Sequence, residues 1–211
     1  MKVKLLNIDN TKSELVEVSD KLLKQKINHK LIKSVVDWQL NHLKPRTAKT
    51  KQKNEIKGST RKIVPQKGSG GARHASRKAP IFVGGGIAHG PKGAVYKFKK
   101  INKKVRKIAL AQTLTKKNMD KNLYILSDVK KKIKKTKEFN KFLVTNNLKN
   151  VVIISDKISL ENIYTSARNI KDLKVINEAG ANIYDMLKYK NVLLTLSSIK
   201  SLEKRIFDEK N

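Results

Sequence analysis

The chain contains no cysteine among its 211 residues. This absence excludes disulfide bridges, thiolate zinc sites and cysteine nucleophiles. Acidic residues are also scarce, because 17 Asp and Glu stand against 49 Lys and Arg, which gives a formal net charge of +32. No apolar run approaches the roughly 18–20 residues that a membrane-spanning helix needs. A charge this positive directs the chain to nucleic acid or to an anionic membrane surface.

Proline and glycine are few, and nearly all of them lie in one stretch. Residues 44–100 hold all four prolines and nine of the ten glycines. Residues 41–100 contain sixteen Lys and Arg and a single acid, Glu55. No helical or alternating apolar pattern organises this stretch, and such a composition buries too little apolar surface to offset the entropy of ordering. We therefore expect it to need a densely negative partner, and folded RNA suits a cationic, Gly- and Pro-rich backbone best.

Apolar periodicity on either side of this stretch predicts an α/β domain. The expected strands lie at residues 3–5, 16–18, 123–126, 151–154, 173–176 and 192–196, and the expected helices at 27–43, 101–114, 137–146, 159–168, 182–189 and 198–207. Alternating strands and helices imply a mainly parallel sheet with helices on both faces. The predicted organisation is one globular domain, residues 1–43 and 101–211, with residues 44–100 as a long irregular basic loop.

Several local features of the helices can be predicted from the sequence. Ile101, Val105, Ile108, Ala111 and Leu114 mark the buried face of one helix, with Asn102 as its N-cap. Glu161 is expected near the capping position of the helix that follows residue 158. Asp156 follows an apolar strand, a place where α/β enzymes often carry catalytic groups, but aspartate there is more often a helix cap or turn residue.

Enzymatic and cofactor motifs are absent from the sequence. Gly85 and Gly90 have phosphate-loop spacing, but Pro91 follows and lacks the N–H that such a loop supplies. The histidines at 29 and 42 are too far apart in sequence for a metal pair, and those at 74 and 89 have no carboxylate nearby in sequence. We expect no enzyme activity, no metal site, no small-molecule substrate and no cofactor, apart from Mg ions held by the RNA itself.

The basic loop has the side chains that RNA recognition uses. Lys and Arg contact phosphates, Arg also stacks on bases, and glycine lets the backbone approach closely. Phe82, Tyr96 and Phe98 can stack on bases or pack locally. A loop that binds any polyanion without selectivity remains an alternative. The lysines at 130–132 and 134–135 form a second basic cluster, interpreted as a solvated turn or helix end that could touch another RNA helix.

The run from Gln66 to Pro80, with Gly84–Gly86 and His89–Pro91, resembles the L-four family of large-subunit ribosomal proteins, bacterial type. The likeness continues at residues 49–51, 57–59, 102–106, 167–169 and 180–182 and spans essentially the whole chain. The resemblance implies an α/β domain on the outer surface of the large subunit and a loop that penetrates its rRNA. It also implies a role in subunit assembly and neighbouring ribosomal proteins as partners, and in some members repression of their own operon or an effect on transcription.

The resemblance implies specific site residues by position. The rRNA-binding residues would be Arg46, Lys49, Lys51, Lys53, Lys57, Arg61, Lys62, Lys67, Arg73, His74, Arg77, Lys78, Lys92, Lys103, Lys104 and Arg106. The loop tip would line the exit tunnel and meet the nascent peptide through Arg61, Lys62, Gln66, Lys67, Gly68, Gly70 and Gly71. The family commonly has an aromatic residue and an arginine where Ile63 to Pro65 stand, so the tunnel wall is expected to be less bulky and less charged here.

Two functions from other classes compete with this interpretation. An α/β enzyme that modifies nucleic acid would need a cofactor loop and a poised acid or base, and the sequence offers neither. A DNA-compacting protein would place its charge along helices or repeats rather than in a Gly- and Pro-rich loop. The strand-like start, Met1–Leu6, resembles no signal peptide. We therefore expect a cytoplasmic ribosomal protein, or one in the matrix or stroma of an organelle that encodes its own copy.

Overall fold

The computed structural model describes residues 1–8, 14–93 and 100–207. The chain divides into two compact units, residues 1–41 with 100–211 and residues 42–99. Among the described residues, the first unit contains every β-strand and all helices from α1 to α7, apart from the last two residues of α2. Tyr96 and Phe98, which were predicted to stack on bases or pack locally, lie outside the described residues.

A six-stranded sheet is the centre of the α/β unit. Its strands are β1 (Lys2–Leu6), β2 (Glu14–Glu17), β3 (Leu123–Leu126), β4 (Val151–Ser155), β5 (Leu173–Asn177) and β6 (Asn191–Thr195). The order is β2-β1-β3-β6-β4-β5, and only the β1–β2 pair is antiparallel. Since the other pairs are parallel, helical crossovers must connect them. The predicted fold class, a mainly parallel α/β sheet, is confirmed.

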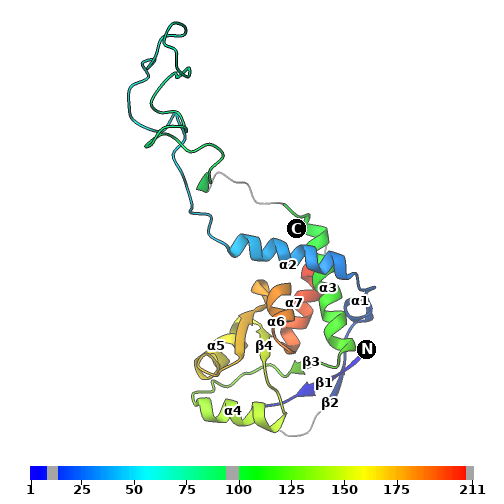
Figure 1. The fold of residues 1–211 in the computed structure, drawn as a ribbon. Coiled ribbons are helices and arrows are strands. Elements are labelled where there is room, and N and C mark those ends of the chain that lie inside the picture. The colour runs from blue at the N-terminus through cyan, green and yellow to red at the C-terminus, as the bar shows by residue number, and fades with distance from the viewer. Residues whose placement is uncertain (9–13, 94–99, 208–211) are drawn as a thin grey trace. The chain divides into compact units, whose positions relative to one another are not determined.

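Helices cover both faces of this sheet (Figure 1). They are α1 (Asp20–Leu23), α2 (His29–Leu43), α3 (Lys103–Met119), α4 (Thr136–Thr145), α5 (Lys157–Ala167), α6 (Ile183–Lys188) and α7 (Leu196–Phe207), with the short 3₁₀ helix η2 (Glu178–Gly180) before α6. In β4, Val152 and Ile154 pack into the core with α3 and α7, whereas Val151 and Ile153 pack into the core with α4 and α5. This alternation gives the unit two apolar cores, one on each face.

Two local predictions are wrong, and the helix geometry explains both. Ile108 is 45% exposed, because the buried face of α3 passes through Ala109 at this point, whereas Ala111 and Leu114 are buried as predicted. Glu161 caps no helix, since α5 begins at residue 157, two residues before the predicted start. Its cap is Asp156, whose carboxylate accepts a hydrogen bond from the Ser159 amide at 3.3 Å. The preferred interpretation of Asp156, as a helix cap, is confirmed.

A buried lysine joins α3 to the turn before β6. Lys117 is 7% exposed. Its Nζ donates hydrogen bonds to the backbone oxygens of Tyr189 at 2.7 Å and Lys190 at 2.9 Å. Burial lowers the pKa of Lys117 below its usual 10.5. The side chain therefore satisfies two carbonyl groups at this end of the sheet.

Replacing this lysine is expected to weaken the α/β unit. Lys117→Met keeps most of the side-chain volume but removes the donor from both carbonyls, so the free energy of unfolding should fall by about 1–3 kcal/mol. Because the folded pKa is depressed, the wild type should gain stability relative to this variant as pH rises from the folded pKa toward 10.5. Urea denaturation monitored by circular dichroism measures both effects. Lys104→Met, at an exposed position on the same helix, is the control and should change little.

Candidate nucleic-acid interface

The cationic loop leaves and returns along two arms that hydrogen-bond to each other. The Thr50 amide donates to the Pro91 oxygen at 2.9 Å, and the Ile87 amide donates to the Lys51 oxygen at 3.0 Å. Further along, the Ile63 amide donates to the Ala75 oxygen at 3.0 Å. Among the described residues of this unit, the only strand-like pairing is an isolated bridge between Lys49 and Lys92. The turn of the loop therefore lies between residues 63 and 75.

Close backbone packing holds the arms together around residues 50–53 and 78–90, which we call the node. A Cβ atom on Gly86 would lie 2.2 Å from the Lys53 nitrogen, and one on Gly90 would lie 2.0 Å from Thr50 Oγ1. Within the returning arm, a Cβ on Gly85 would lie 2.0 Å from the Ala79 oxygen. These distances are too short for any side chain, so only glycine permits the approach. The node is ordered by its own contacts, although it contains no helix or strand.

The tip of the loop has a different character. Gly68 and Gly70 adopt positive φ angles of 84° and 62°, and no described atom lies within 4 Å of where their Cβ atoms would be. Lys62 donates to Gln66 Oε1 at 2.6 Å, a local contact on the side of the turn that precedes these glycines. The residues predicted to form the tunnel tip, Arg61 to Gly71, therefore occupy the first arm and most of the turn. The seven residues named for the tip in the sequence analysis are all exposed.

Exposure separates the predicted rRNA-binding residues into two groups. Eleven of the thirteen in the loop are exposed, namely Arg46, Lys49, Lys51, Lys53, Lys57, Arg61, Lys62, Lys67, Arg73, Arg77 and Lys92. Lys78 and His74 are half-buried, and His74 packs edge-on against Phe82 with ring centroids 5.0 Å apart. The one acid of the segment, Glu55, lies 3.9 Å from Lys49. The charge of the loop is thus presented to solvent rather than neutralised by carboxylates of its own.

The remaining predicted residues belong to the α/β unit. Lys103 and Lys104 are exposed in the first turn of α3. Arg106 is half-buried, with its guanidinium carbon 5.0 Å from the centre of the Trp38 ring. Sequence reasoning missed that Arg106 shares a groove with Lys204 and Arg205 of α7. Sequence spacing could not have predicted this groove, because nearly a hundred residues separate its cations on α3 from those on α7.

The carboxyl edge of the sheet, where α/β enzymes place their chemistry, is occupied by capping interactions. Asp128 accepts hydrogen bonds from the Ser197 amide at 3.0 Å and the Ser197 hydroxyl at 2.5 Å. Asp156 caps α5 and accepts from the Thr195 hydroxyl at 3.3 Å. Within the described ranges, no three histidines or acids gather as a metal site would require. The acids at this edge hold helix ends in place.

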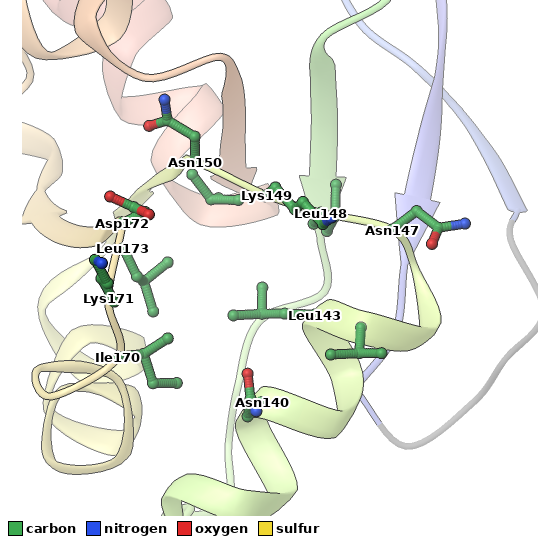
Figure 2. Close-up of a pocket in the computed structure, with 12 residues that line it drawn as sticks. Asn140, Leu143, Asn147, Leu148, Lys149, Asn150, Ile170, Lys171, Asp172 and Leu173 are labelled. Atoms are coloured by element: carbon green, nitrogen blue, oxygen red, sulfur yellow. The ribbon is translucent and has the colours of Figure 1, made fainter.

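A small cavity of about 260 Å³ lies at the opposite edge, between α4 and the turns that precede β4 and β5 (Figure 2). The turns contain Asn147, Asn150 and Asp172 with φ angles of 52°, 54° and 59°, a conformation that Asn and Asp tolerate better than other side chains. Lys149, Lys171 and Asp172 line it together with asparagine and aliphatic side chains. Its mixed charge and small size make it a packing gap between turns rather than a nucleic-acid site.

No described helix is long and apolar enough to cross a bilayer. Comparison with known proteins places the chain in a class of structural, non-enzymatic components of the large ribosomal subunit. A model of the "Ribosomal protein L4/L1 family" matches residues 16–205. The chain belongs to this family, and the sequence-based family prediction is confirmed.

Relatives match the chain over nearly its whole length. A "Large ribosomal subunit protein uL4" from Pelagibacter ubique is 50% identical over 206 residues, which cover 97% of this chain and 99% of the relative. Proteins of the same name from Desulforapulum autotrophicum and Aquifex aeolicus are 39% and 35% identical, covering 96% and 90% of this chain and 97% and 96% of their own lengths. As a protein of the large subunit, the chain works in translation beside rRNA and other ribosomal proteins.

The close packing at the node predicts that Gly86 and Gly90 cannot be replaced by alanine without loosening the loop. Gly86→Ala or Gly90→Ala must displace the facing backbone or the Thr50 side chain, so the hydrogen bonds between residues 50–51 and 87–91 should be lost. In the free protein, trypsin should then cut after Lys51 and Lys53 about tenfold faster, because local opening costs less free energy. Gly71→Ala is the matched control, since its Cβ would meet nothing described nearer than the Ser69 oxygen at 3.9 Å. Equal cleavage of all three variants would contradict the packing described here.

Proposed function

We propose that residues 44–100 thread into the folded rRNA of the large subunit and neutralise its phosphates from within. The observation that carries this proposal is the exposure of eleven loop cations beside a single acid. Such charges gain most when they displace counterions from closely packed phosphates. The node supports the same function, because a partly ordered loop loses less entropy on docking. No cofactor of the protein's own is needed, since any Mg²⁺ would be held by the rRNA.

We further propose that the loop tip reaches the wall of the nascent-peptide exit tunnel. A fully extended arm of about 28 residues spans roughly 90 Å, and the turns of the node shorten this reach. The open glycines at 68 and 70 support the proposal, because a backbone without side chains can pass close to RNA and to a moving peptide. Ile63 and Pro65 would make this part of the wall aliphatic.

Charge removal at the tip tests the rRNA-binding proposal. About ten phosphate contacts would weaken binding by about 10³–10⁵ between 50 and 200 mM salt. Replacing Arg61, Lys62 and Lys67 by glutamine should reduce the slope of log affinity against log salt by about 2–3, because each neutralised phosphate contributes about 0.7–0.9 to that slope. Filter binding to transcribed large-subunit rRNA measures the slope.

The control for this experiment removes the same charge elsewhere. Lys137, Lys141 and Lys149 are exposed on α4 and the turn after it, and their replacement by glutamine should leave the slope nearly unchanged. If both triple variants reduce the slope equally, the protein binds rRNA through its overall positive charge, and the loop tip contributes no more than any other basic surface. A nonspecific polyanion-binding loop would also bind an unrelated structured RNA as tightly as the rRNA.

Cross-linking tests the position of the tip. A photoreactive amino acid at position 66, in ribosomes carrying a stalled nascent chain, should cross-link to that chain, because the proposal places Gln66 at the tunnel wall. The same amino acid at position 137 on α4 should give no such product. If position 66 cross-links to rRNA alone, the proposal that the tip lines the exit tunnel is wrong, whereas the proposal that the loop binds rRNA still holds.

A further inference from the structure

A groove of about 610 Å³ lies in the α/β unit, outside the basic loop. Four elements form it: α2, the start of α3, the segment from η2 to α6, and the end of α7. Its lining comprises Val35, Trp38, Gln39, Lys103, Arg106, Lys107, Leu110, residues 179–183, Lys204, Arg205 and Ile206. The Tyr184 amide donates to Gln39 Oε1 at 3.0 Å, which fastens α2 to α6 and fixes one wall.

Positive charge is concentrated on this groove. Five of its lining residues are lysine or arginine, three from the first turns of α3 and two from the last turn of α7, and none is acidic. The lining therefore carries five positive charges and no negative one, and the acid next to it in sequence, Glu178, directly precedes the lining segment 179–183. Clefts lined by one sign of charge attract oppositely charged ligands most strongly.

Two of these cations, Arg106 and Arg205, are held near each other. Nη1 of Arg205 donates to the backbone oxygens of Glu178 at 2.9 Å and Ala181 at 3.4 Å. Partial burial and the neighbouring charge of Arg106 lower the pKa of Arg205. The Nε atom of Arg106 is buried and has no hydrogen-bond acceptor among the described residues. Both arginines line the groove, so an anionic oxygen bound there can contact a guanidinium group from α3 and another from α7.

The size and the apolar wall of the groove narrow the choice of anion. A phosphate group alone would fill only a small part of 610 Å³. The rest is lined by aliphatic side chains, such as Val35, Leu110 and Ile206, and by the Trp38 side chain. Bases of unpaired RNA bind where aromatic or arginine planes and apolar surface lie beside cations. An acidic peptide would use the cations but not the apolar wall.

We propose that this groove binds one unpaired nucleotide of an RNA strand, with its phosphate between Arg106 and Arg205 and its base against the apolar wall. The inference rests on the proposed function for its ligand class, which is RNA. It does not rest on the loop, because every lining residue belongs to the α/β unit. The protein would then hold rRNA at two separate places.

Trp38 is the only tryptophan of the chain, so its fluorescence reports on this groove alone. Titration of the full-length protein with single-stranded hexauridylate should change the Trp38 emission and reach saturation. Arg106→Gln and Arg205→Gln should each weaken the apparent affinity at least about tenfold, as expected when one charge-assisted hydrogen bond is removed. Lys137→Gln, an exposed change on α4, should leave it within about twofold.

Two further variants separate the groove from folding and from the loop. Arg106→Lys keeps the charge and should retain part of the affinity, and Lys103→Gln, an exposed change on the groove rim, should weaken binding without disturbing the fold. Circular dichroism of every variant identifies any that unfold. The triple glutamine variant at Arg61, Lys62 and Lys67 should leave the Trp38 titration unchanged, so failure at the loop and failure at the groove give different results.

Three outcomes would overturn this proposal. The first is no saturable change in Trp38 emission with hexauridylate while the Arg106 and Arg205 variants remain folded. The second is inorganic phosphate producing the same change at the same concentration, which would reduce the groove to a simple anion site. The third is a hexaglutamate peptide binding more tightly than hexauridylate, which would make the partner an acidic protein segment.

Discussion

The unbalanced charge of residues 41–100 is the constraint on which the rest of the molecule depends. One carboxylate stands against sixteen basic side chains, and among the described ones it forms an ion pair with Lys49 at 3.9 Å. Like charges this dense repel one another, which opposes collapse around an apolar core. Most of its described cations are exposed, and hydrogen bonds between backbone groups hold its compact parts together. A polyanion that supplies the missing charge from outside removes this repulsion.

Glycine residues at the node allow the backbone of the two arms to pack closely although the side chains of the loop repel one another. A Cβ on Gly86 would lie 2.2 Å from the Lys53 nitrogen, and one on Gly90 would lie 2.0 Å from Thr50 Oγ1, so the arms approach closely only because these positions are glycine. Lysines at 51 and 53 can therefore point outward while their backbone is held. The sequence-based view of a wholly structureless segment was too simple. That prediction considered only how much apolar surface the segment can bury. The node is held instead by backbone hydrogen bonds and close packing.

Periodicity predicted the α/β unit well because its cores alternate as strands and helices require. Val151 to Ile154 have the pattern of a buried strand, and their side chains divide between two cores as a central strand should. The errors concern single positions that a periodic pattern does not fix. Ile108 lies just off the buried face of α3, and the N-cap of α5 is Asp156, with no capping role for Glu161. The groove at Arg106 could not be predicted, because tertiary packing alone brings α3 beside α7.

The α/β unit does more than carry the loop. Residues outside 41–100 hold sixteen of the seventeen acids and still retain an excess of positive charge. Some of these acids serve local structure, as at Asp128 and Asp156, which close the sheet edge where an enzyme would bind its substrate. Its cations include five gathered on one groove. In the α/β unit, carboxylates at the sheet edge hold helix ends while cations remain on the surface. This distribution of charge agrees with the structural, non-enzymatic role of the family, although the fold is one that many enzymes use.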